Sequence, residues 1–268
     1  MKIEEVLHRL KDRGEKALII YITAGDPDLE VTEKLVCSIA KAGADIVELG
    51  IPFSDPLADG VTIQQASQRA LKSNTNIPQI LSTIVRIRKK SPIPLALMTY
   101  YNPIYCYGLN RFVIDCKKAG VDGFIVPDLP LEESEELGDI AHRAGMDLIS
   151  FLAPTSTPER IAAITQSARG FIYCVSVTGV TGVRKEFSIK IVEMIEKIRL
   201  YSDIPLAIGF GISNPEQAKE ATRYADAVIV GSAVIKLIED YRGDLSKTLS
   251  KVNIFIRSLK EAIAIINK

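Results

Sequence analysis

Two carboxylates and a tyrosine fall where their side chains could carry out acid–base chemistry. Glu48 lies near the end of the apolar run 45–49, Asp59 closes the loop-like stretch that follows this run, and Tyr173 lies inside a later apolar run. A carboxylate that enters an apolar interior is partly desolvated, which raises its pKa and suits it to proton transfer near neutral pH. These residue types therefore indicate proton transfer without a cofactor.

Each of the three residues also has a structural interpretation. Glu48 could instead face a helix and pair with a lysine or arginine, and its position alone leaves the two interpretations about even. Asp59 precedes Gly60 and a helical pattern, so a helix N-cap is the better interpretation of this residue taken alone. Tyr173 taken alone is better explained as a core aromatic.

Glycine and hydroxyl residues gather after the last three apolar runs of the chain. Gly211-Ile212-Ser213 and Gly231-Ser232 each open a helical pattern, and a Gly/Thr-rich stretch at 177–182 precedes them. Backbone N–H groups at the start of a helix bind anions, and α/β barrels often hold phosphate at this place. A single such turn is more often only structural, but the three together predict a phosphate site.

The elements that must position these residues alternate regularly between strand and helix. Short apolar runs that read as parallel strands buried on both faces alternate with amphipathic segments, such as 29–42 and 188–200. The length of 268 residues is close to the ~250 typical of one α/β barrel. We therefore predict a (β/α)₈ TIM barrel that forms a single domain over residues 1–268, with strands at 17–23, 45–49, 94–99, 122–126, 147–151, 170–176, 205–210 and 226–230.

Helices at both ends of the chain and a short repeat complete this prediction. Ile3, Val6, Leu7 and Leu10 have helical spacing and predict an extra N-terminal helix, and the segment 245–266 predicts a helix packed outside the barrel. The pattern A-G-x-D recurs at 42–45, 119–122 and 144–147. Its glycine suits the left-handed end of a helix, so we interpret the repeat as structural.

Composition excludes several classes of function. Lys+Arg and Asp+Glu both number 33, which argues against a partner bound by bulk charge, such as nucleic acid or membrane. The four cysteines have no C-x-x-C spacing and the two histidines, His8 and His142, lie away from strand ends, so a metal site and histidine catalysis are not expected. No predicted strand contains the lysine that a Schiff-base aldolase needs. With no apolar run long enough for a membrane span, we expect a soluble, cytoplasmic protein.

The segment 48–60, ELGIPFSDPLADG, resembles the most characteristic segment of the tryptophan synthase alpha chain family. The resemblance extends over almost the whole chain, through Thr23–Pro27, Pro127–Pro130, Thr178–Gly182, Gly209–Ile212 and Gly231–Ala233. It implies retro-aldol cleavage of indole-3-glycerol phosphate to indole and glyceraldehyde 3-phosphate by a lyase of tryptophan biosynthesis. No cofactor is implied for this chain.

The resemblance also implies a role for individual residues. Glu48 would shuttle protons to the indole ring and from the side-chain hydroxyl, Asp59 would bind the indole N–H, and Tyr173 would lie beside the indole. The family's phosphate site matches Gly182, Gly211, Gly231 and Ser232. An indole pocket would draw on Tyr21, Ile125, Phe210 and Ile229, with Thr181 on a closing loop.

A partner is implied as well, the tryptophan synthase beta chain in an αββα heterotetramer, which would carry pyridoxal phosphate and receive indole through a tunnel. The loops 52–60 and 177–188 would then be ordered by substrate or partner, with Pro52, Asp55 and Asn102-Pro103 as contact points. Two positions depart from many relatives: Tyr21 replaces a phenylalanine, and Val177 stands where some relatives have an arginine. Both departures leave the catalytic positions intact.

Two rival functions remain open on the sequence. One is another phosphate-binding barrel enzyme, which would need neither an indole pocket nor the segment 48–60. The other is a catalytically silent subunit that activates a partner, against which the presence of Glu48, Asp59 and Tyr173 argues. A free-standing lyase that releases indole is a variant of the main interpretation.

Overall fold

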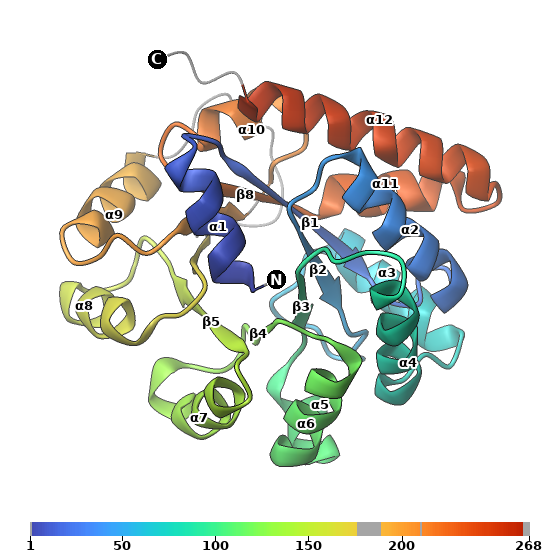
Figure 1. The fold of residues 1–268 in the computed structure, drawn as a ribbon, viewed down its shortest axis with the longest axis horizontal. Coiled ribbons are helices and arrows are strands. Elements are labelled where there is room, and N and C mark those ends of the chain that lie inside the picture. The colour runs from blue at the N-terminus through green and yellow to red at the C-terminus, as the bar shows by residue number, and fades with distance from the viewer. Residues whose placement is uncertain (1, 176–188, 210, 265–268) are drawn as a thin grey trace.

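The computed structural model describes residues 2–175, 189–209 and 211–264. Eight parallel strands pair in chain order, and β1 also pairs with β8, which closes the sheet into a barrel (Figure 1). The strands are β1 Ala17–Thr23, β2 Ile46–Gly50, β3 Leu95–Met98, β4 Gly123–Ile125, β5 Asp147–Leu152, β6 Ile172–Val175, β7 Leu206–Gly209 and β8 Ala227–Val230. The predicted TIM barrel is confirmed, although residues 176 and 210, which end two predicted strands, lie outside the described ranges.

Helices surround the barrel, and two of them follow each of β2, β3 and β8 (Figure 1). None of the helices in the described ranges combines the length and apolar character needed to cross a membrane. Their bounds, with one 3₁₀ turn η1, are α1 Ile3–Asp12, α2 Leu29–Ala42, α3 Val61–Lys72, α4 Ile77–Arg88, α5 Tyr101–Tyr107, α6 Leu109–Ala119, η1 Leu131–Glu133, α7 Glu135–Arg143, α8 Pro158–Ser167, α9 Ile189–Arg199, α10 Pro215–Ala221, α11 Ser232–Tyr241 and α12 Leu245–Ala264.

The first and last helices lie where the sequence predicts them. Helix α1 buries its four apolar residues among inward-facing side chains of the barrel, so the extra N-terminal helix is confirmed as a plug. It covers the amino ends of the strands, because a Cβ atom on Gly123 at the start of β4 would approach Ile3 Cδ1 to 3.0 Å. Helix α12 packs against α2, α10 and α11 outside the barrel. The carboxyl ends of the strands are thus left for the loops that carry the candidate residues.

The A-G-x-D repeat is structural, as predicted. Its glycines end α2 and α6 and follow α7 in the left-handed conformation, with φ of 112° at Gly43, 94° at Gly120 and 70° at Gly145. Asp45 and Asp122 follow two of these glycines, and Asp226 takes the equivalent place before β8. Each of the three carboxylates accepts a hydrogen bond from a backbone N–H of the preceding strand and pairs with a basic side chain. These contacts are Asp45 with Leu18 N–H (2.8 Å) and Lys260 (2.6 Å), Asp122 with Leu95 N–H (2.9 Å) and Arg88 (2.6 Å), and Asp226 with Leu206 N–H (2.9 Å) and Arg199.

Asp147, the third aspartate of the repeat, lacks these partners among the described residues. Its Oδ2 atom is buried without a hydrogen bond, and no basic side chain of the described chain lies within 4.0 Å. Burial, followed by the nearby charge of Glu4, raises the pKa of Asp147 to about 6. Because this pKa is higher in the folded than in the unfolded chain, stability falls as pH rises from about 4 to about 6 and stays low above it.

Replacing Asp147 with asparagine should therefore stabilise the protein at pH 7.5 and leave it unchanged near pH 4. We expect a gain of about 1 kcal/mol in the free energy of unfolding, which allows for the partial exposure of the side chain. Denaturant unfolding at the two pH values measures this gain. The matched control Asp45→Asn should lose stability, since Lys260 loses its partner. Equal stability of wild type and Asp147→Asn at both pH values would contradict a penalty at this carboxylate.

Candidate active site

Glu48 projects into the barrel from the middle of β2. It lies opposite Tyr21 of β1 and Ala96 of β3, and its side chain alternates with those of Val47 and Leu49, which belong to the outer core. Only 1% of Glu48 is exposed, and its Oε2 atom has no hydrogen-bond partner among the described residues. Burial, followed by the charge of Asp59, raises the pKa of Glu48 to about 8. The alternative in which Glu48 faces a helix is therefore wrong, and no basic side chain of the described ranges forms an ion pair with it.

Asp59 lies in the loop that joins β2 to α3. Gly60 is the N-cap of α3 and makes no side-chain cap bond, so the N-cap interpretation of Asp59 is wrong. The peptide N–H of Asp59 instead donates to Pro56 O at 3.0 Å, which forms a turn. Burial raises the pKa of Asp59 to about 6, and a hydrogen bond from the Tyr100 hydroxyl opposes this rise.

Tyr100 is a residue of this site that the sequence interpretation does not single out. It follows β3, is 5% exposed, and its hydroxyl accepts the N–H of Ala58 at 2.9 Å. Its ring lies 5.4 Å from that of Phe53. Tyr100 thus ties the loop after β2 to the end of β3 and holds Asp59 near Glu48. The only available signal in the sequence is its place directly after a predicted strand.

Two tyrosines lie over glycines of the neighbouring strand. A Cβ atom on Gly50 would lie 2.2 Å from the Tyr21 hydroxyl, and one on Gly209 would lie 2.4 Å from the Tyr173 hydroxyl. These approaches require glycine at both positions, because no side chain fits beneath the phenol rings. The Tyr21 hydroxyl is also 3.2 Å from Thr23 Oγ1, and the Tyr173 ring stacks on Phe151 at 5.0 Å.

The two tyrosines and the two carboxyls interact electrostatically. Burial raises the pKa of both Tyr21 and Tyr173 far above its usual range, and the charges of Glu48 and Asp59 raise both further. The two carboxyls have pKa values near 8 and 6, so at pH 7 the pair holds one proton, mostly on Glu48. A protonated acid and a carboxylate thus face the same end of the barrel.

Apolar and glycine residues border this group. Ile125 and Ile229 are buried in the barrel interior, at 0% and 4% exposure. Gly231 is the N-cap of α11, and a Cβ atom there would lie 3.2 Å from Tyr21 Cβ. Gly211 has a φ of 71° and open space where a Cβ would be, and Ser232 is exposed in the first turn of α11. The start of α11 thus lies beside Tyr21, and Ile125 and Ile229 belong to the apolar barrel interior against which Tyr173 packs.

Thr181, Gly182 and Phe210 lie outside the described residues, as does Val177. His8 and His142 lie on α1 and α7, away from the carboxyl ends of the strands. Within the described ranges, no three His, Cys, Asp or Glu side chains are grouped as a metal ion would require.

Comparison with known proteins identifies the family of this chain. A sequence model described as tryptophan synthase alpha chain matches residues 7–264. Tryptophan synthase alpha chains of Citrifermentans bemidjiense and a Thermoanaerobacter species are each 48% identical, covering 98% of this chain and 97% and 99% of theirs. The crystal structure of the alpha chain from Legionella pneumophila superposes with a TM-score of 0.90 at 36% identity, over 100% of this chain and 99% of that one. The chain belongs to the tryptophan synthase alpha chain family.

Proposed function

We propose that this chain is the alpha subunit of tryptophan synthase and cleaves indole-3-glycerol phosphate to indole and glyceraldehyde 3-phosphate. The single observation that carries the proposal is the pair formed by the buried Glu48 and the half-buried Asp59, which holds one proton near neutral pH at the mouth of the barrel. Family membership supports the same reaction. The chain acts as a lyase that needs only its own side chains for this step.

Glu48 moves the protons of the reaction. Its protonated carboxyl first donates to C3 of the indole ring, which makes the ring an acceptor of electrons. The resulting carboxylate then takes the proton of the hydroxyl on the adjacent side-chain carbon. The carbon–carbon bond breaks, its electron pair returns to the ring, and the oxygen becomes the aldehyde of glyceraldehyde 3-phosphate. Glu48 ends protonated, so the cycle consumes no net proton.

Asp59 and the neighbouring groups hold the substrate for this transfer. The Asp59 carboxylate accepts the indole N–H and stabilises the positive charge that develops on the ring. Tyr21, Tyr173, Ile125 and Ile229, with Phe210, form the indole pocket. The N–H groups at the start of α11 bind the phosphate through Gly231 and Ser232, together with Gly211, Gly182 and the closing loop at Thr181.

We further propose that a tryptophan synthase beta chain, which carries pyridoxal phosphate, docks on the loops after β2 and β3. Large apolar side chains are exposed there: Leu57 is 93% exposed, Tyr105 is 67% exposed and Val61 is 60% exposed. A contact on Leu57 would act directly on the loop that carries Asp59. Closing this loop would exclude water from the carboxylate pair and raise the rate.

An assay of indole release tests the function and the partner together. The chain is mixed with indole-3-glycerol phosphate, with and without a beta chain. Slow release alone and faster release with the beta chain support both proposals, and fast release alone indicates a free-standing lyase. No indole in either mixture, with the chain folded, would favour another phosphate-binding barrel or a silent subunit.

The pH dependence of the rate should follow the carboxylate pair. We expect kcat/KM to peak near pH 7, to fall below pH 6 as Asp59 is protonated, and to fall above pH 8 as Glu48 loses its proton. The substrate phosphate also titrates at a pKa of about 6, so the alkaline side is the diagnostic one. Initial rates from pH 5 to 9 measure the profile, and a rate that keeps rising above pH 8 would contradict a protonated Glu48.

A further inference from the structure

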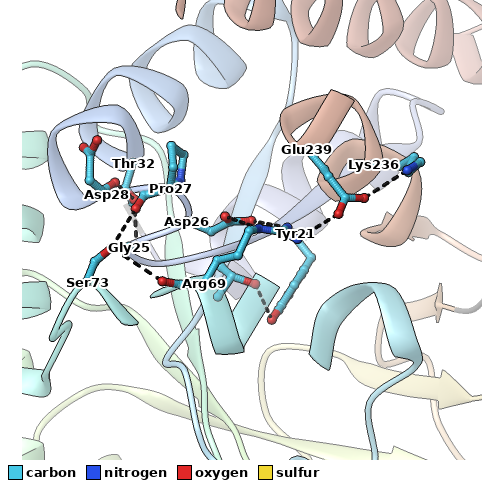
Figure 2. A network of polar contacts seen from close by, with 11 residues as sticks. Tyr21, Gly25, Asp26, Pro27, Asp28, Thr32, Arg69, Ser73, Lys236 and Glu239 are labelled. Carbon is cyan, nitrogen blue, oxygen red and sulfur yellow. Dashed lines mark hydrogen bonds and ion pairs between the residues drawn. The ribbon is translucent and has the colours of Figure 1, made fainter. Parts of the chain in front are cut away.

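Arg69 forms ion pairs with two carboxylates near the candidate site. From α3, its Nε and Nη2 atoms donate to the two carboxylate oxygens of Asp26, both at 2.8 Å, and Nη1 donates to Glu239 Oε1 on α11 at 3.0 Å (Figure 2). The side chain of Asp26 is 2% exposed and that of Arg69 is 16% exposed. One guanidinium thus joins three segments that are far apart in the sequence.

The loop that carries Asp26 is itself held firmly. The Gly25 N–H donates to Thr32 Oγ1 at 2.9 Å, and the Ser73 hydroxyl donates to Pro27 O at 3.1 Å (Figure 2). A Cβ atom on Gly25 would lie 2.2 Å from Thr75 Oγ1, so nothing larger than glycine fits. Asp26 is therefore a fixed anchor at the end of β1, the strand that carries Tyr21.

The two helices that Arg69 connects begin at the two ends of the proposed substrate site. Helix α3 begins at Val61, directly after Asp59 and Gly60, and Arg69 lies two turns further on. Helix α11 begins at Ser232, directly after Gly231, and Glu239 also lies two turns further on. The helices pack against each other and both pack against β1. The bridge therefore lies about 10–12 Å along each helix from its start.

We propose that Arg69 is a positioning residue: by bridging Asp26 and Glu239 it sets the distance between the start of α3, with Asp59, and the start of α11, with the phosphate-binding residues. This inference rests on the proposed function. A substrate that contacts both Asp59 and the start of α11 binds well only at one distance between the two. A ligand that contacts only the start of α11, such as inorganic phosphate, does not depend on this distance. The planar guanidinium suits this role because its N–H donors point in fixed directions. A lysine ammonium group cannot reproduce this geometry.

Binding measurements separate this role from a general effect on stability. Dissociation constants for indole-3-glycerol phosphate and for inorganic phosphate are measured by calorimetry with the full chain carrying Glu48→Gln, so that the substrate is not cleaved. Adding Arg69→Lys should weaken substrate binding about tenfold and change phosphate binding less than twofold. Adding Glu239→Gln, which keeps the buried pair with Asp26, should weaken substrate binding about threefold with the same selectivity.

A matched variant and the starting protein make the outcomes distinct. Arg88→Lys disturbs a similarly buried ion pair with Asp122 at the amino ends of the strands, and should lower stability without changing either dissociation constant. The inference is overturned if folded Arg69→Lys binds the substrate as well as its parent, or loses affinity for both ligands equally. If Arg69→Lys does not fold, unchanged substrate binding by Glu239→Gln overturns it. Absence of substrate cleavage by the wild-type chain would instead count against the proposed function.

Discussion

Glu48→Gln should slow the release of indole about a thousandfold while substrate still binds. Glutamine keeps the shape of the protonated carboxyl but cannot give up and regain a proton. Both proton transfers of the proposed cycle pass through Glu48, so no other side chain of the described site replaces it. Steady-state rates with and without a beta chain, together with the dissociation constant of the substrate, measure the effect.

The fold should tolerate this change well. Since the pKa of Glu48 is about 8 in the folded chain, the residue stays mostly neutral at pH 7, whereas it ionises above about pH 4.5 in the unfolded chain. This difference lowers stability as pH rises from about 4.5 to about 8. Glutamine removes this penalty, so the melting temperature of the variant should equal or exceed that of wild type at pH 8. Glu33→Gln makes the same chemical change away from the site, at a residue of α2 that forms ion pairs with Arg86 and Lys90, and should leave the rate unchanged. Full activity of folded Glu48→Gln would refute the role of this residue.

Asp59→Asn should lower kcat about a hundredfold and change KM much less. The asparagine can still accept the indole N–H through its amide oxygen, but it offers no negative charge to the ring when the ring becomes positive. The loss therefore appears in the transition state rather than in binding. Stopped assays over a range of substrate concentrations give the two constants separately.

The same variant carries a second, independent signature. The charge of Asp59 is one of the causes that raise the pKa of Glu48, so its removal should move the alkaline side of the pH profile to lower pH. The exposed Asp139→Asn on α7 is a control that should change neither the rate nor the profile. A profile identical to that of wild type would show that the two carboxylates do not interact.

The strands and the end helices could be predicted from the sequence because their buried faces require apolar residues at a regular spacing. The run from Ala17 to Thr23 is buried at every residue, as its uninterrupted apolar pattern predicts for a parallel strand covered on both faces. Helix α1 buries the four residues that share one helical face. Gly43 and Gly120 mark helix ends because glycine reaches the left-handed conformation without the strain that a side chain would cause.

Contacts between distant residues could not be predicted in this way. Arg69 meets Glu239 across 170 positions, and nothing in the helical pattern of α3 distinguishes it from a solvated arginine. Tyr100 reaches the loop of Asp59 from another strand. Asp147 shares its motif with Asp45 and Asp122, but only the packing of the barrel reveals that it lacks their basic partners among the described residues.

Single site residues also depend on contacts that are distant in the sequence. Taken alone, the sequence around Asp59 predicts an N-cap at this residue, whereas the structure assigns that place to Gly60. The buried state of Glu48 depends on which face of β2 it takes, and this face is set by the register with Tyr21 and Ala96. The resemblance to a family adds what local patterns lack, because it implies that these residues act together.

The most direct test of this account measures both products of one reaction. Wild-type chain and Glu48→Gln are incubated in parallel with indole-3-glycerol phosphate, and indole and glyceraldehyde 3-phosphate are quantified over time. We predict equal amounts of the two products from wild type and almost none from the variant. Equal rates from the two proteins, or consumption of substrate by wild type without indole, would contradict the retro-aldol cleavage at Glu48.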